Sequence, residues 1–229
     1  MVRRVLAVMA LIVVVLWGAG ADAEEVLVKL KEGEYLLLVE KDRHTLTIYD
    51  HTLKPLSTYR VTTGKVAGDK QKEGDLKTPE GVYFFTEYID GRRLHRKYGV
   101  GALVMDYPNP FDRLKGKGGY GIWLHATDEP ERINIPRDTR GCVVTTDEDF
   151  LRIKALVRLG ATPVVVVKKA ELRDGAPLAE EIKEEAPIEG TPISIIALRD
   201  MAVVEDGKKR LYLLSDRSWR IIKTEPVND

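Results

Sequence analysis

A histidine and a cysteine, His125 and Cys142, are the residues of this 229-residue chain best suited to covalent chemistry. Cys142 is the only cysteine, so it cannot form an internal disulfide. A thiol attacks as its thiolate, and a neighbouring imidazole can take the proton and return it to a leaving amine. The pair therefore favours nucleophilic acyl transfer. Each residue alone also fits a structural role, as a buried thiol or a hydrogen-bonded core histidine.

The residues before the cysteine suit a reactive turn. Thr139, Arg140 and Gly141 precede Cys142, and a glycine there lets the backbone turn tightly and lets a substrate approach closely. Backbone N–H groups of Gly141 and Cys142 are expected to face a developing oxyanion. The turn thus favours catalysis at the thiol.

Arg140 has two interpretations. An arginine guanidinium stays protonated, so Arg140 cannot act as a base. It can instead bind a substrate carboxylate or favour the thiolate. The alternative is a salt bridge to Asp138 or Asp147.

Short strands and one helix are expected to position these residues. The run 121–125 predicts a strand that ends at His125, and Cys142 begins another short apolar run. Adjacent strand ends would bring the two side chains within hydrogen-bond reach. Thr146 is the predicted N-cap of a following helix that Gly160 ends. Strands are also expected at 35–39, 45–49, 55–63, 82–88 and 163–167.

Taken together, the motifs resemble the signature of L,D-transpeptidases with a YkuD-type catalytic domain. The matching motifs are Val61-Thr-Thr-Gly64, Lys77-Thr-Pro-Glu-Gly81, His125-Ala126 and Thr139-Arg-Gly-Cys-Val143. The resemblance covers about residues 35–168. It implies a mainly β fold, a β-sandwich with a capping helix and long cleft loops. It also makes Cys142 the nucleophile, His125 the base and the Ala126 carbonyl the third member of the triad.

The resemblance implies acyl transfer on peptidoglycan stem peptides. Cys142 would attack the third residue of a tetrapeptide stem, release D-Ala and pass the acyl group to an amine. That amine would belong to another stem, a lipoprotein or a free D-amino acid, whereas water would make the enzyme an L,D-carboxypeptidase. Two other classes remain, a non-catalytic cell-wall-binding module and an unrelated cysteine peptidase. The family usually has histidine where this chain has Arg140, and glycine or serine where it has Ala126, which leaves substrate choice open.

The resemblance implies no cofactor and no metal, and His44, His51 and His95 are scattered without metal-ligand spacing. The segment 91–121 is predicted to be a long irregular loop that lines the cleft. Tyr120 and Trp123 are expected near the nucleophile, with core packing as the alternative for Trp123. Lysines of the loop 64–77 either form a solvated face or contact the wall polymer; they are Lys65, Lys70, Lys72 and Lys77.

The ends of the chain are assigned separately. Residues 1–23 resemble a signal peptide, with an apolar stretch at 5–17 and an Ala-Asp-Ala cleavage site, so export to the periplasm or cell wall is expected. A membrane anchor at 5–17 is the alternative. Residues 170–192 are predicted to be a linker with a helical turn near 178–185, and 193–229 a short C-terminal β extension with a hairpin at Asp206-Gly207. Lys+Arg and Asp+Glu both number 36, which argues against a nucleic-acid partner.

Overall fold

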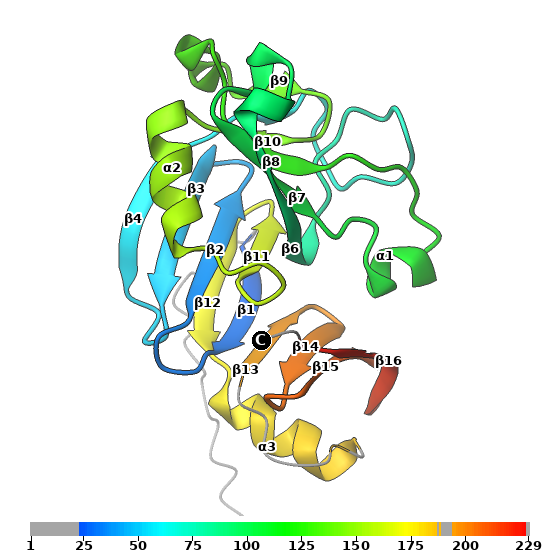
Figure 1. Cartoon of the computed structure of the whole chain (residues 1–229). Helices are drawn as coiled ribbons and strands as arrows, with labels where there is room; N and C mark the ends of the chain where they lie inside the picture. Colours follow the sequence, from blue (N-terminus) through cyan, green and yellow to red (C-terminus); the bar gives the residue numbers. More distant parts are fainter. Residues whose placement is uncertain (1–22, 187, 189–193, 228–229) are drawn as a thin grey trace, which may run out of the picture.

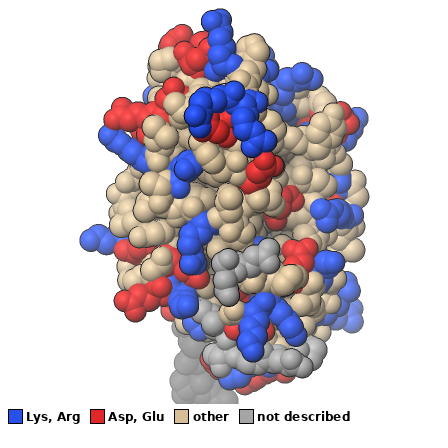
Figure 2. All heavy atoms as spheres, viewed as in Figure 1, with Lys and Arg blue, Asp and Glu red and all other residues tan. Residues whose placement is uncertain are grey.

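The computed structural model describes residues 23–186, 188 and 194–227, so the expected apolar signal segment lies outside the described residues. The fold is mainly β, as predicted, and consists of two large sheets that share a buried core (Figure 1). Among the described helices, none is long and apolar enough to cross a membrane. On the face seen in Figure 2, Lys and Arg side chains are mixed with Asp and Glu.

An eight-stranded mixed sheet carries the sequence motifs. Across the sheet, its strands are β10 (Val143–Val144), β8 (Trp123–His125), β7 (Gly101–Met105), β6 (Gly81–Asp90), β11 (Pro163–Val167), β2 (Tyr35–Glu40), β3 (Thr45–Asp50) and β4 (Pro55–Arg60). The predicted hairpin of β2 and β3 is confirmed. Every residue of β11 is buried, because both faces of the sheet are covered.

Helix α2 (Asp147–Leu156) covers one face of this sheet. The Thr146 hydroxyl accepts a hydrogen bond from the Asp149 N–H at 3.1 Å, which confirms the predicted N-cap. Phe150 and Ile153 are fully buried against the sheet. The expected capping helix is therefore present and begins five residues after Cys142, but it ends at Leu156 and not at the predicted Gly160.

The prediction of an irregular loop over 91–121 is wrong at its centre. Residues 101–105 form β7, which lies between β6 and β8 in the sheet. This run is short and flanked by glycine and proline, so the sequence alone gives little sign of a strand. Pairing on both sides makes it one, and Leu103 and Met105 are buried. The rest of the segment contains η1 (Gly91–Arg93), η2 (Arg96–Tyr98) and α1 (Pro110–Leu114).

A six-stranded sheet packs against the first. Its strands are, in order, β12 (Ala170–Asp174), β1 (Glu24–Lys29), β13 (Ser194–Leu198), β14 (Met201–Glu205), β15 (Lys209–Ser215) and β16 (Trp219–Pro226). The predicted hairpin at Asp206-Gly207 is confirmed by the antiparallel pairing of β14 with β15. Strand β1 lies between β12 and β13, so the C-terminal β extension is part of a sheet that includes the start of the described chain.

The segment 170–192 differs from the predicted linker. It contains β12, which pairs parallel with β1, and helix α3 (Ala176–Glu185), which extends the helical turn expected near 178–185. Leu178 and Ile182 of α3 are buried against the outer face of the six-stranded sheet. The charged composition that suggested a linker belongs to the solvent-facing side of this helix.

A small two-stranded sheet lies beside the motifs. It pairs β5 (Thr63–Gly64) in parallel with β9 (Arg137–Thr139), after the turn η3 (Pro130–Asn134). The Lys65 N–H donates to the Thr139 carbonyl at 2.9 Å. The loop that begins at Lys65 is therefore attached to the turn that leads into Cys142.

Candidate active site

His125 ends strand β8, and Cys142 immediately precedes its neighbouring strand β10. Strands β10 and β8 are parallel, and Val144 is opposite His125. Side chains alternate along a strand, so Cys142, two residues before Val144, lies on the same side of the sheet as His125. Both line one cleft of about 350 Å³. The structure thus brings the predicted pair together.

His125 is held in one tautomer. Its Nδ1 lies 2.6 Å from the Ala126 carbonyl oxygen, and a carbonyl can only accept. Nδ1 therefore carries the proton, and Nε2 is left as an acceptor. Burial lowers the His125 pKa to about 4, which keeps the imidazole neutral at neutral pH. The ring packs against Tyr98, with 4.8 Å between ring centroids.

Cys142 is half-buried, and its thiol donates to the Gly121 carbonyl at 3.4 Å. Burial raises the pKa of this thiol. The backbone N–H of Trp123 acts in the opposite direction by hydrogen bonding to the sulfur, and the charge of Lys97 adds to that effect. Burial has the larger effect, so the resting thiol is protonated and its reaction requires a base.

The turn before the thiol is fixed by Thr139. Its hydroxyl accepts from the Gly141 N–H at 3.0 Å and donates to the Cys142 carbonyl at 2.7 Å. Gly141 has a φ of 130°, and a Cβ there would lie 2.7 Å from the Lys77 carbonyl oxygen. The turn therefore requires glycine.

The hydrogen bonds of this turn distinguish between the two backbone N–H groups that were expected to bind an oxyanion. The Gly141 N–H already donates to Thr139. The Cys142 N–H has no acceptor among the residues that the structure describes. The Cys142 N–H is consequently the better of the two expected donors for a substrate oxygen.

The cleft wall is mainly cationic. Its charged residues are Lys65, Lys97, Arg132, Asp138 and Arg140. Asp138 pairs with Arg132 at 2.8 Å, and Asp147, outside the cleft wall, accepts from the Val100 N–H at 3.0 Å. Arg140 is exposed and forms no ion pair in the described part of the chain. The salt bridges to Asp138 or Asp147 that were the alternative interpretation of Arg140 are therefore both absent.

Three other residues singled out by the sequence, Tyr120, Trp123 and Lys70, do not line the cleft. Tyr120 is 76% exposed and does not line the cleft. The Trp123 ring packs against the Tyr98 ring, with 5.3 Å between the ring centroids, and the Trp123 backbone N–H hydrogen-bonds to the Cys142 sulfur. Lys70 is buried and paired with Asp75 at 2.8 Å, so it is not part of a solvated lysine face.

Sequence reasoning missed three residues of the cleft, Lys97, Tyr98 and Arg132. The basic run at 92–97 was the available signal, but its position beside His125 depends on the pairing of β7 with β8. Within the described residues, no group of three or more His, Cys, Asp or Glu could hold a metal ion.

Comparisons with known proteins agree with this geometry. The YkuD family, the L,D-transpeptidase catalytic domain, matches residues 34–166. The solved structure of Bd1075 from Bdellovibrio bacteriovorus is 21% identical, with a TM-score of 0.64, over 89% of this chain and 97% of that one. The helical cell shape determining protein Pgp2 from Campylobacter jejuni is 19% identical, with a TM-score of 0.60, over 89% and 96%. No curated protein matches the sequence.

Proposed function

Because the chain belongs to the family of L,D-transpeptidase catalytic domains, we propose that it transfers an acyl group from a peptidoglycan tetrapeptide stem to an amine through a thioester on Cys142. The observation that carries the proposal is the shared cleft of Cys142 and His125, with Nδ1 of His125 bonded to the Ala126 carbonyl. That bond leaves the other ring nitrogen available as a base.

The first half of the reaction forms the thioester. As the Cys142 sulfur attacks the carbonyl of the third stem residue, its proton passes to Nε2 of His125. The Cys142 N–H stabilises the oxyanion of the tetrahedral intermediate. When the intermediate collapses, the bond to D-Ala breaks, and the imidazolium gives its proton to the departing amine.

The second half resolves the thioester. An acceptor amine attacks the thioester carbonyl and loses a proton to His125, and the bond to sulfur then breaks as the thiol regains that proton. Water in place of the amine gives the L,D-carboxypeptidase outcome. The acceptor follows from incubating the enzyme with a tetrapeptide, with and without a D-amino acid, and measuring the products by mass spectrometry. A tripeptide as the sole product under both conditions would contradict transpeptidation.

The nucleophile is tested with a carbapenem. Imipenem should add covalently to the native protein and not to Cys142→Ala, as measured by intact mass. An adduct on the alanine variant would refute the assignment. A native protein that binds cell wall but forms no adduct would favour a non-catalytic wall-binding module.

Arg140 supplies a specific test of donor recognition. Arg140 is an exposed cation on the cleft wall with no ion-pair partner among the described residues, and it suits the carboxylate of the donor peptide. Arg140→Ala should weaken donor use by about 1.5–3 kcal/mol if this contact is a charge-assisted hydrogen bond. The loss should be smaller for the C-terminal amide of the same tetrapeptide. An equal effect on both substrates would show that Arg140 does not read the carboxylate.

A cellular role is proposed from the signal-like N-terminus and from the structural similarity to Pgp2. Stem peptides lie outside the cytoplasmic membrane, so the protein needs export, for which residues 1–23 have the pattern. The match to Pgp2 over most of both chains suggests a role in cell shape. Deletion of the gene should alter both the stem-peptide profile and the cell outline. Mature protein that retains residues 1–23 would favour the membrane anchor over cleavage.

A further inference from the structure

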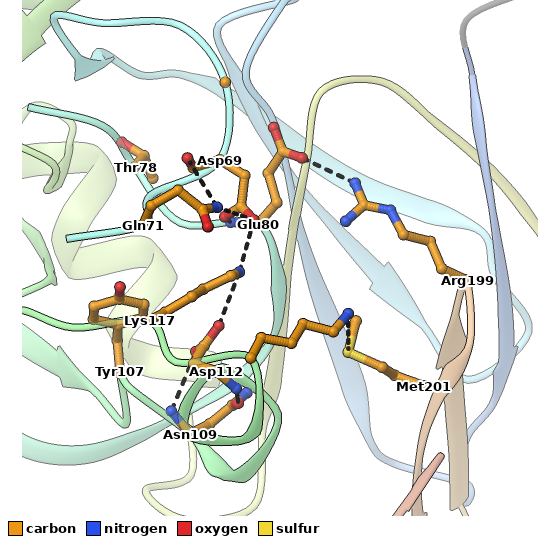
Figure 3. A network of polar contacts seen from close by, with 12 residues as sticks. Asp69, Gln71, Thr78, Glu80, Tyr107, Asn109, Asp112, Lys117, Arg199 and Met201 are labelled. Atoms are coloured by element: carbon orange, nitrogen blue, oxygen red, sulfur yellow. Dashed lines mark hydrogen bonds and ion pairs between the residues drawn. The ribbon is translucent and has the colours of Figure 1, made fainter. Parts of the chain in front are cut away.

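A partly buried ion network joins the two sheets beside the loop between β5 and β6. Glu80, just before β6, is 8% exposed. Its carboxylate pairs with Lys41 at 2.9 Å and with Arg199 at 2.9 Å. Arg199 belongs to the turn between β13 and β14 of the six-stranded sheet and also pairs with Glu24 of β1. Figure 3 shows the Arg199 side chain reaching toward Glu80 from the strands of that second sheet.

Lys41 connects this network to the loop between β5 and β6 and holds that loop in place. Its ammonium donates to the Gly68 carbonyl at 2.7 Å and to the Thr78 carbonyl at 2.9 Å, besides pairing with Glu80. Lys41 is 5% exposed, and burial lowers its pKa. A buried cation is costly unless it is paired, so Lys41 depends on Glu80. The two carbonyls that it holds lie near the two ends of the loop between β5 and β6.

A second buried lysine supports the same loop. Lys117 pairs with Asp69 at 2.7 Å and with Asp112 at 3.0 Å. Asp69 also accepts from the Glu80 N–H at 2.9 Å, so both lysines converge on the backbone around Glu80. Figure 3 shows Asp69 beside Glu80, with Lys117 and Asp112 below them.

The clamped loop lies directly against the nucleophile's turn. The Thr78 hydroxyl accepts from the Gly64 N–H at 2.9 Å. The adjacent Lys77 carbonyl oxygen lies where it would contact any side chain on Gly141, at 2.7 Å from an added Cβ. A shift of the segment 77–78 therefore changes the space that Gly141 and Cys142 occupy.

From these contacts, we propose that Arg199 and Glu80 are positioning residues, which act through Lys41 and the segment 77–78 to hold the turn of Cys142 in its reactive geometry. The proposal deepens the proposed function, because it takes Cys142 as the nucleophile. It also gives the six-stranded sheet a role in the reaction, as the support from which Arg199 reaches the loop.

The test compares neighbouring residues of one turn. Arg199→Ala removes the contact with Glu80. Asp200→Ala is the matched control, because Asp200 pairs at 3.5 Å with Lys115, which follows helix α1, and does not contact Glu80. Arg199→Lys restores the charge. The first measurement is imipenem acylation followed by intact mass, separated into the maximal rate constant and the half-saturating concentration, well below each variant's melting temperature.

Arg199→Ala should lower the maximal rate constant by about 10- to 100-fold, the scale expected when a reacting group is displaced by about 1 Å. The half-saturating concentration should change little, Arg199→Lys should recover most of the rate, and Asp200→Ala should match the native protein. If Arg199→Ala does not fold, Arg199→Gln replaces it with the same expected fall. A folded variant with an unchanged rate constant would overturn the proposal.

A second measurement separates this inference from the proposed function. Iodoacetamide alkylates a thiol without any enzymatic activity, and its rate follows the thiolate. Loosening the turn exposes the sulfur, so the alkylation midpoint of Arg199→Ala should move to lower pH, while Asp200→Ala should keep the native midpoint. If the native protein forms no imipenem adduct but the midpoint shifts, the proposed function fails and the positioning role stands. Identical midpoints for all variants would refute the positioning role.

Discussion

Removing the His125 imidazole should make folding stability less sensitive to acid. The native His125 pKa is about 4 because the ring is buried, against an ordinary value of 6.5 for the unfolded chain. On acidification, the unfolded state therefore takes up this proton first. The stability that His125 contributes is complete above about pH 6.5 and is lost as the pH falls toward 4.

The size of this effect follows from the two pKa values. Between pH 7.5 and pH 4.5, the difference in proton binding amounts to about 2.5 kcal/mol of unfolding free energy. His125→Gln has no group that titrates in this range. The native protein should therefore lose about 2.5 kcal/mol more than the variant over that interval, while all other titrating groups cancel in the comparison.

Urea denaturation followed by circular dichroism at the two pH values measures this difference. His51→Gln is the control, because it removes an exposed imidazole in the turn between β3 and β4. Imipenem acylation by the native protein should lose its rate only as the pH approaches 4. Equal pH dependence of stability in the native protein and in His125→Gln would refute the argument that His125 is buried as the neutral base.

Two further predictions concern backbone and charge. Gly141→Ala should lose about 1–3 kcal/mol of stability in thermal denaturation, because of strain at its positive φ, and should lose most imipenem acylation in intact-mass assays. Gly118 has open space around it, so Gly118→Ala should keep both the stability and the acylation of the native protein. Burial raises the pKa of Asp106 to about 7, so the stability held by its neutral form is lost as the pH rises through 7. Asp106→Asn should therefore gain up to about 4 kcal/mol relative to the native protein between pH 4 and pH 9 in urea denaturation, and no relative gain would contradict the buried acid.

Residues close together in the chain made much of the fold predictable. Alternating or apolar runs predicted β2, β3 and β11, and Asp206-Gly207 predicted the hairpin of β14 and β15. Thr146 predicted the start of α2. These signals depend on local backbone preference and on periodic burial, both of which the sequence displays directly.

The candidate pair was also visible in the sequence, because it consists of one cysteine after a glycine and one histidine at a strand end. The sequence did not reveal the cationic wall of Lys97 and Arg132, which reach the cleft from the separate short helices η2 and η3. It also assigned the Gly141 N–H to the oxyanion, whereas the Thr139 hydroxyl holds it. Both facts depend on side-chain geometry that spacing does not specify.

By itself, the sequence determined the reactive residue types, the local strands and the helix that follows the thiol. Only the tertiary structure decided that 101–105 is a strand, that 170–174 joins a sheet with β1, and that Lys41 lies buried against the loop before Glu80. The physical reason is that these features depend on partners far away in the chain. A short or charged segment becomes ordered when distant strands supply its hydrogen bonds, and a lysine becomes buried when a distant carboxylate supplies its counter-charge.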